Sequence, residues 1–346
     1  MNGDATGPVA SNVRRIAHMD IAGGRQIIDI HGQIHTPGLD AVIEAAGVPG
    51  APAKRKKGGI GDPALRRVLT DVDARIEDMA RIGVDRTVLS PAPPQVFYRA
   101  NADLALTLAR AQNDHIAEVV AAHPRRFAGL GAVPLQHVAL AVPELERLMG
   151  ELGLKGVRVN SNINRMELDD PSLEDFYAAA EELGALLFLH PQGFTDAERL
   201  GDYFLSNIVG QPLESTLALS RIIFAGVLER FPDLKICVAH GGGFLPFYIG
   251  RFDQAYAKRP ECQVNITKPP SDYLRQVYFD TVLFEARSLA YLAGLVGPGR
   301  LVMGTDRPYD MSEDDPAGFI GSVAGLTDAE KQDILGGTTA RLLDLN

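Results

Sequence analysis

The sequence is poor in cysteine and has no excess of basic residues, and both shortages exclude classes of protein. Its 346 residues include only two cysteines, Cys237 and Cys262, which are too few for a disulfide framework and form no CxxC motif. Such a shortage is typical of a protein of the reducing cytoplasm. Lysine and arginine number 34 against 44 acidic residues, which gives a net charge of -10. We therefore expect no nucleic-acid partner.

Long apolar runs are lacking as well. The strongly apolar run at 185–189 is far shorter than the roughly 20 residues that a membrane-spanning helix needs, so no membrane association is expected. The first 17 residues contain no hydrophobic segment of the secretory type, and we expect residues 1–25 to form an N-terminal arm. Residues 26–346 show no low-complexity tract, internal repeat or linker, which predicts a single domain.

Short apolar runs alternate with helical segments along this domain. Strands are expected at 26–30, 86–89, 127–133, 156–159, 186–190, 235–240, 277–280 and 301–304. Helices are expected at 71–83, 101–120, 138–152, 171–183, 215–230 and 289–296. The stretch 36–63, rich in Gly, Pro and Ala and carrying a basic cluster at 54–57, is expected to be a loop inserted after the first strand. This α/β alternation, with eight strands, predicts a closed parallel (β/α)8 TIM-like barrel.

Three histidines and one aspartate stand where expected strands end. They are His31, His190, His240 and Asp306. In a parallel barrel these ends converge on one mouth, and imidazole nitrogens with a carboxylate suit one divalent metal ion, Zn or Mn. A single histidine at a strand end is more often structural, and an isolated Asp often starts a turn. The joint placement of all four favours a shared metal site.

Three features near these residues allow two interpretations each. The glycines at 241–243 permit either a close approach to substrate or only a tight turn. Arg251, which follows a Phe- and Tyr-rich helix start, either binds a carboxylate through its planar guanidinium or forms a surface ion pair. His35 has no strand-end position of its own, but a loop could fold it back as a replacement ligand.

Several motifs together resemble the amidohydrolase superfamily, and specifically its aminocarboxymuconate-semialdehyde decarboxylase-like branch. The motifs are IDIH at 28–31, KGVRVN at 155–160, FLHP at 188–191, FPDLK at 231–235, HGGG at 240–243, GTD at 304–306 and ILGG at 334–337. Their order and spacing cover roughly residues 26–345. The match is specific for the family and much less so for the substrate.

The resemblance implies a metal-dependent barrel enzyme of the amidohydrolase type. By this resemblance His31, His190 and Asp306 bind the metal, and His240 acts as an acid or base. It also implies that Arg251 reaches a substrate carboxylate, in some members across a dimer interface, so a homodimer or a higher homo-oligomer is expected. Known members decarboxylate aromatic or muconate-type acids without oxidation, while others in the wider group hydrolyse or hydrate ring-fission products.

Two departures from the family pattern affect the site. Gln33 stands where the family usually has the second histidine of His-x-His. An amide oxygen is a weak ligand, so Gln33 is expected to hold the ion loosely, to favour Mn over the usual Zn, or to leave the site without metal. Arg307 stands where tyrosine is common, and we expect it to reshape the substrate pocket.

The sequence therefore predicts a metal-dependent, non-oxidative decarboxylase of a small aromatic or muconate-type carboxylic acid. In this hypothesis His240 or Asp306 delivers a proton to carbon. Two alternatives remain. One is a hydrolase that cleaves a carbon–carbon, ester or amide bond with the same residues. The other is a non-catalytic binding barrel, which the Gln33 substitution suggests.

Overall fold

Eight parallel strands form the centre of the protein. The structure, a computed structural model, describes residues 26–47, 62–195 and 197–345. The strands of the central sheets are β1 (Ile28–Ile34), β2 (Arg86–Pro91), β3 (Phe127–Gly129), β4 (Gly156–Asn160), β7 (Leu186–His190), β8 (Lys235–Val238), β9 (Tyr278–Asp280) and β10 (Leu301–Val302). A small antiparallel hairpin, β5 (Asn162–Ile163) and β6 (Met166–Glu167), follows β4.

The eight strands are joined into a ring. Parallel ladders give the orders β1-β2-β3 and β10-β9-β8-β7-β4. A parallel bridge between Gly131 and Val157 links the chain after β3 to β4. On the other side, the Ile30 amide donates to the Met303 carbonyl at 2.9 Å, which joins β1 to the residue after β10. These bonds confirm the predicted barrel.

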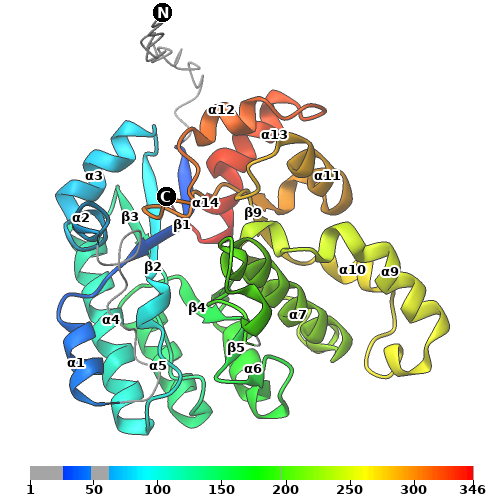
Figure 1. The fold of residues 1–346 in the computed structure, drawn as a ribbon, viewed down its shortest axis with the longest axis horizontal. Coiled ribbons are helices and arrows are strands. Elements are labelled where there is room, and N and C mark those ends of the chain that lie inside the picture. Colours follow the sequence, from blue (N-terminus) through cyan, green and yellow to red (C-terminus); the bar gives the residue numbers. More distant parts are fainter. Residues whose placement is uncertain (1–25, 48–61, 196, 346) are drawn as a thin grey trace, which may run out of the picture.

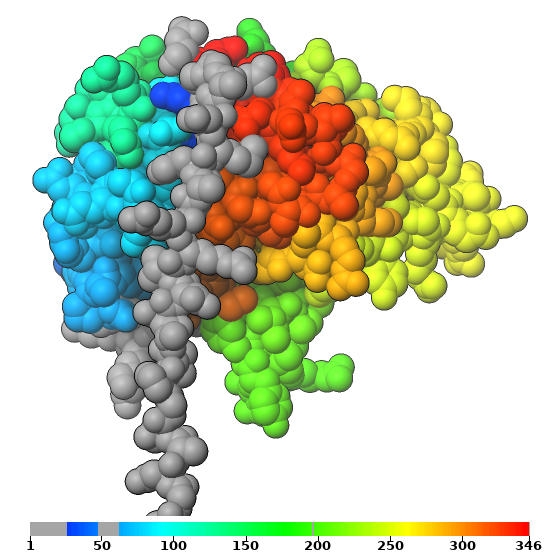
Figure 2. All heavy atoms as spheres, turned by 90° about the horizontal axis from the view of Figure 1, so that it is seen from above, coloured from blue at the N-terminus to red at the C-terminus, as the bar shows by residue number. Residues whose placement is uncertain are grey.

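Helices surround this ring, as Figure 1 shows. They are α1 (Leu39–Ala45), α2 (Pro63–Thr70), α3 (Val72–Arg81), α4 (Ala102–Ala122), α5 (Val138–Gly150), α6 (Glu174–Glu182), α7 (Gln211–Phe224), α8 (Val227–Arg230), α9 (Leu245–Lys258), α10 (Pro270–Leu274), α11 (Ala286–Val296), α12 (Pro316–Gly321), α13 (Asp328–Gln332) and α14 (Thr338–Leu342). Side chains that cap first turns fix several of the starts: Asn101 accepts from Leu104 before α4, and Asp71 from Ala74 before α3. Figures 1 and 2 both show the region of α9, in yellow, projecting from the body.

The core has two parts because alternate strand residues face opposite sides of the sheet. Val157 and Val159 of β4 belong to a large cluster shared with the helices. A second cluster contains side chains from several strands, including Ile30 and Phe188, and residues of α14 cover it. Arg158, between the two valines of β4, faces the other side of the sheet and is fully buried.

Several expected boundaries are wrong. The stretch 36–63, expected to be an inserted loop, contains α1 and the first residue of α2, although its basic cluster at 54–57 lies outside the described residues. The single helix expected at 215–230 is interrupted between α7 and α8, where Gly226 has a φ of 72°. A side chain at this glycine would meet the Asn265 carbonyl oxygen at 2.2 Å, so the chain must turn here.

Two further differences concern the site. β1 continues to Ile34, so His31 lies inside the strand rather than after it. β8 ends at Val238, and His240 stands in a separate 3₁₀ turn. The expected arm at 1–25 lies outside the described residues. Within the described part of the chain, every helix is too short or too polar to cross a membrane.

Candidate metal centre

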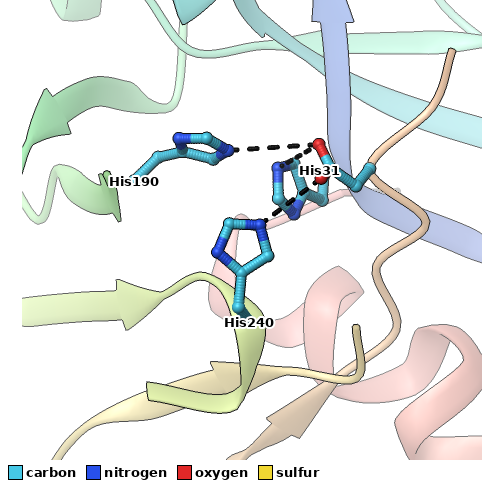
Figure 3. A group of neighbouring side chains, drawn as sticks. His31, His190 and His240 are labelled. Carbon is cyan, nitrogen blue, oxygen red and sulfur yellow. Dashed lines mark hydrogen bonds and ion pairs between the residues drawn. The ribbon is translucent and has the colours of Figure 1, made fainter. Parts of the chain in front are cut away.

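Four side chains from four elements meet at the carboxyl ends of the strands. His31 lies in β1, His190 ends β7, His240 follows β8, and Asp306 follows β10. One potential ligand atom from each residue lies within 4.8 Å of the others. Figure 3 shows the three imidazole rings gathered around one carboxylate. The fold thus assembles the group that strand ends predicted.

The Asp306 carboxylate is the centre of this cluster. Its Oδ1 lies 3.1 Å from His31 Nε2 and 4.0 Å from His190 Nε2, and its Oδ2 lies 3.4 Å from His240 Nε2. Burial raises the pKa of Asp306, but His31 and His240 outweigh burial and hold the pKa well below its usual range. The carboxylate is therefore ionised at neutral pH and offers its oxygens to cations.

The ring of His31 is oriented by a second carboxylate, that of Asp280 at the end of β9. His31 Nδ1 donates to Asp280 Oδ2 at 2.7 Å, which leaves Nε2 directed at Asp306. Asp280 Oδ1 also accepts the backbone amides of Gly241 and Val282, at 3.1 and 3.2 Å. Burial lowers the pKa of His31, but Asp306 and Asp280 outweigh it and raise the pKa to about 10. Asp280 therefore fixes the tautomer that presents Nε2 as a ligand.

His190 is kept neutral by its surroundings. Burial and then the Arg158 guanidinium hold its pKa well below the ordinary value. Its Nδ1 lies 2.7 Å from Arg158 Nη2 and 2.6 Å from the Pro191 carbonyl oxygen. Its buried Nε2 has no hydrogen-bond partner among the described residues. A neutral imidazole with an unpartnered nitrogen beside a carboxylate is suited to a metal ion.

His240 stands in a strained turn. Its φ is 55°, a value uncommon for a residue with a side chain, and Gly241 follows with a φ of 59°. A side chain on Gly243 would meet the Pro212 carbonyl oxygen at 2.1 Å. The space beside these glycines is filled by protein, which supports the tight turn rather than the substrate approach. The turn brings His240 Nε2 to the edge of the cluster.

Gln33 lies two residues after His31 and points into the same cluster. Its Nε2 donates to Asp306 Oδ1 at 2.5 Å and lies 3.5 Å from His31 Nε2. Its Oε1 is buried without a hydrogen-bond partner among the described atoms. The amide thus occupies the region of the expected second histidine, and rotation about its last bond would exchange the donor for a ligand oxygen.

Hydrogen bonds of the Asp29 carboxylate join β1 to the chain after β10, and we call this set of bonds the seam. The buried Asp29 carboxylate accepts from the His31 amide at 2.9 Å, from the Thr305 amide at 3.0 Å and from the Thr305 hydroxyl at 2.7 Å. Asp29 belongs to β1, whereas Thr305 follows β10. The seam therefore fixes His31 and Asp306 relative to each other.

Three other candidate residues from the sequence, Arg307, Arg251 and His35, do not belong to the four-residue cluster. Arg307 pairs with Asp78 of α3 through Nε and Nη2, at 2.6 and 2.8 Å, and also with Asp314. Arg251 is exposed on α9. His35 lies 3.8 Å from Asp40 and is not part of the four-residue cluster. The guanidinium of Arg307 therefore has carboxylate partners of its own.

Sequence reasoning missed two residues that contact the cluster. Asp280 ends a strand that was expected from the sequence, so the argument that found His190 applied to it equally. Arg158 interrupts an otherwise apolar strand and reaches His190. A charged residue inside an apolar strand was the available signal for Arg158.

The donor set fits one divalent ion. Three imidazoles and a carboxylate provide nitrogen and oxygen donors of the kind that Zn and Mn accept. The unpartnered Nε2 of His190 and the oriented Nε2 of His31 face the same Asp306 oxygen. The strained backbone of Asp306, with a φ of 59°, brings the carboxylate to this point.

Known proteins resemble the chain that carries this cluster, both in sequence and in fold. The amidohydrolase family profile matches residues 28–345. The chain is 39% identical over 277 residues to a 2-amino-3-carboxymuconate-6-semialdehyde decarboxylase of Dictyostelium discoideum, which covers 80% of this chain and 77% of that protein.

Two solved structures share the fold. The 5-carboxyvanillate decarboxylase of Sphingomonas paucimobilis superposes with a TM-score of 0.84 and 29% identity, covering 93% of this chain and 100% of that one. A dihydroxybenzoic acid decarboxylase from Polaromonas sp. has a TM-score of 0.80 and 27% identity, covering 93% and 98%. The latter contains bound manganese and the inhibitor 2-nitroresorcinol.

Proposed function

The chain belongs to the amidohydrolase family, and from this premise we propose that it is a metal-dependent, non-oxidative decarboxylase of an aromatic or muconate-type carboxylic acid. One observation carries the proposal. The cluster of His31, His190, His240 and Asp306 forms a candidate site for a divalent ion in a chain whose relatives include decarboxylases. Reaction at this site would make the protein a carbon–carbon lyase.

We assign His31, His190 and Asp306 as the ligands of one Zn or Mn ion, with Gln33 adjacent through its amide. When bound, such an ion supplies Lewis-acid polarisation of the substrate's oxygens. The protein prepares two of these ligands in advance. Asp280 holds the ring of His31. Burial raises the pKa of Asp306, but the neighbouring histidines outweigh burial and hold the pKa low, so the carboxylate stays ionised.

Decarboxylation breaks the bond between the carboxyl carbon and the carbon that carries it. The carboxyl group leaves as carbon dioxide, the electron pair stays on the carbon that carried it, and that carbon then takes up a proton. Asp306 is poorly suited to deliver this proton because its pKa is held well below the usual range, against the effect of burial. His240 is better suited, since its Nε2 lies 3.4 Å from Asp306 Oδ2 at the edge of the cluster. We therefore assign proton delivery to His240 and substrate positioning to the ionised carboxylate.

Elemental analysis of the purified protein, wild type and Gln33→His, tests the metal. We expect about one Zn or Mn per chain in the wild type, because His31, His190 and Asp306 already converge. Gln33→His adds an imidazole and is expected to tighten binding. A wild type without metal, beside a stoichiometric Gln33→His protein, would show that this chain has lost its ion and would favour a binding role.

Carbon dioxide release tests the reaction. The metal-loaded protein is incubated with aromatic and muconate-type acids, and bicarbonate and the decarboxylated product are measured. We expect a product that lacks one carboxyl group and carries a hydrogen from solvent at the carbon to which that group was attached. His240→Asn is expected to retain metal and to lose at least about a hundredfold in rate. Solvent oxygen in the product without carbon dioxide would instead identify a hydrolase.

We also propose a homodimer formed through α9. The projecting region carries exposed aromatic side chains: Phe244, Phe247 and Tyr248 are 37, 44 and 61% exposed. Phe247 stacks on the partly exposed Tyr291 of α11, with ring centroids 5.1 Å apart. Clustered exposed aromatics are typical of interfaces. Arg251 is exposed on the same helix, and we propose that it reaches a substrate carboxylate bound in the neighbouring subunit.

We place the protein in the cytoplasm and treat residues 26–346 as one domain, preceded by an arm at 1–25. The first proposal rests on the two cysteines, since Cys237 and Cys262 are both free thiols. The second rests on the family match, which begins at residue 28 and continues to 345.

A further inference from the structure

Arg158 is a buried cation without a carboxylate partner. Its side chain is fully buried on β4. Nη1 donates to the Pro91 carbonyl oxygen at 2.7 Å, and Nη2 lies 2.7 Å from His190 Nδ1. Nε has no partner, and no carboxylate of the described chain is within ion-pair distance of the guanidinium. A buried charge left in this way is costly, because neither water nor a counter-ion compensates it.

The other buried arginine has a different environment. Arg75 donates to the Gln33 carbonyl oxygen, and two carboxylates, Asp29 and Asp78, favour its charged form. For Arg158 the carboxylate that favours the charged form is Asp306, which is itself a proposed ligand of the metal. Burial lowers the pKa of Arg158 to about 10, so the guanidinium is still charged at neutral pH. With the metal in place, two cations would stand close together, and the carboxylate of Asp306 would be shared between them.

Two buried phenols, those of Tyr98 and Tyr309, interact electrostatically with Arg158. Neither hydroxyl group donates to an acceptor among the described residues, although the backbone amide of Asn160 approaches the oxygen of Tyr98. Burial raises the pKa of both phenols, so each remains a neutral hydrogen-bond donor. The guanidinium, whose Nε lacks an acceptor, is itself a donor group suited to an anion.

The contacts of His190 show how Arg158 becomes available. His190 Nδ1 cannot both accept from Arg158 and donate to the Pro191 carbonyl oxygen. A His190 ring that presents Nε2 to a metal keeps its proton on Nδ1 and donates it to Pro191. Arg158 Nη2 then loses its acceptor. Metal binding therefore leaves a buried guanidinium with donors that need a new oxygen.

We propose that Arg158 binds the carboxylate of the substrate beside the metal. This assignment rests on the proposed function and deepens it, because it names a residue that selects an acid over the neutral ring. The carboxylate supplies the negative charge that Arg158 lacks. It also explains why a cation is retained next to a metal site.

Calorimetric binding to the manganese-loaded protein tests the proposal. The probes are 2,6-dihydroxybenzoate and cis,cis-muconate, with resorcinol as the neutral ring that lacks a carboxylate. We expect Arg158→Gln to weaken binding of the acids by at least about tenfold and to leave resorcinol unchanged. Arg158→Lys keeps a charge but loses the planar fork, and we expect a smaller loss. Manganese content is measured for each variant.

The control is Arg221→Gln, because Arg221 is half exposed on α7 and pairs with Asp169 away from the cluster. We expect it to bind the acids as the wild type does. If Arg158→Gln fails to fold, Arg158→Lys decides the matter. Unchanged acid affinity in a folded, manganese-loaded Arg158 variant overturns the proposal, as does a wild type that binds neither acid. Binding that depends on Arg158 without release of carbon dioxide would support this inference and remove the proposed reaction.

Discussion

At the scale of single residues, Asp280 does more than its position outside the four-residue cluster suggests. One of its oxygens holds the ring of His31, and the other accepts the amide of Gly241, next to His240. One carboxylate thus orients a proposed ligand and the turn that carries the proposed acid. Buried partners of this kind commonly affect metal affinity nearly as much as the ligands do.

Replacement of this carboxylate tests its role. We expect Asp280→Asn to lower metal affinity by about ten- to a hundredfold, because the amide cannot accept from both His31 and Gly241. Competition with a chromophoric chelator measures the affinity. Asp272→Asn is the matched control, since Asp272 forms an exposed ion pair with Arg275. Equal affinities for both variants would contradict the role assigned to Asp280.

The proton on His31 gives a second prediction. In the metal-free protein burial lowers its pKa, but Asp306 and Asp280 raise it from 6.5 to about 10. Because the folded pKa is the higher one, the protonated ring stabilises the metal-free fold fully below pH 6.5. This contribution is lost as the pH rises toward 10. A metal ligand must be unprotonated, so the ion has to displace this proton.

We therefore expect close to one proton to be released for each ion bound near neutral pH. Titration calorimetry in two buffers of different ionisation enthalpy measures the number of protons. Metal affinity should rise by about tenfold per pH unit in this range. Binding heats that do not depend on the buffer would show that His31 is already neutral in the metal-free protein.

At the scale of elements, the seam between β1 and the chain after β10 decides the geometry of the site. Asp29 holds Thr305 through both its amide and its hydroxyl group. We expect Thr305→Val to lower the free energy of unfolding of the metal-free protein by about 1–2 kcal/mol, because a buried carboxylate oxygen loses a donor. Urea unfolding measures the change. Thr107→Val is the control, because the exposed hydroxyl group of Thr107 bonds only within its own helix, to the Asp103 carbonyl oxygen.

Metal affinity should fall in Thr305→Val along with stability, since the seam also positions Asp306. A variant that is destabilised but binds the ion as tightly as the wild type would show that the seam supports the fold alone.

The sequence predicted elements better than it predicted their contacts. Short apolar runs located the eight strands, because alternation and strand ends are local features of the chain. The break before α8 was missed because it depends on how closely Asn265 approaches Gly226. Arg307 was expected to reshape the substrate pocket, but its pairing with Asp78, 229 residues away in sequence, was not predicted. Contacts over such separations are set by the closed ring, which local patterns do not describe.

At the scale of the whole molecule, the projecting α9 region gives a test of assembly. We expect light scattering to show a dimer for the wild type. Tyr248→Asp should shift it toward the monomer, because a charge in a buried apolar contact is unfavourable. Val42→Asp is the control, since Val42 is an exposed apolar residue on α1. A monomeric wild type, or equal masses for both variants, would contradict an interface at α9.

The seam also has a consequence for synthesis of the chain. Thr305, the neighbour of Asp306, leaves the ribosome 276 residues after Asp29, the seam residue of β1. A nascent chain that holds β1 and β7 alone presents two of the proposed ligands without the carboxylate between them. Capture of the ion would therefore wait until the segment that carries Asp306 has left the ribosome. Products that terminate before this segment would leave the cellular metal pool untouched.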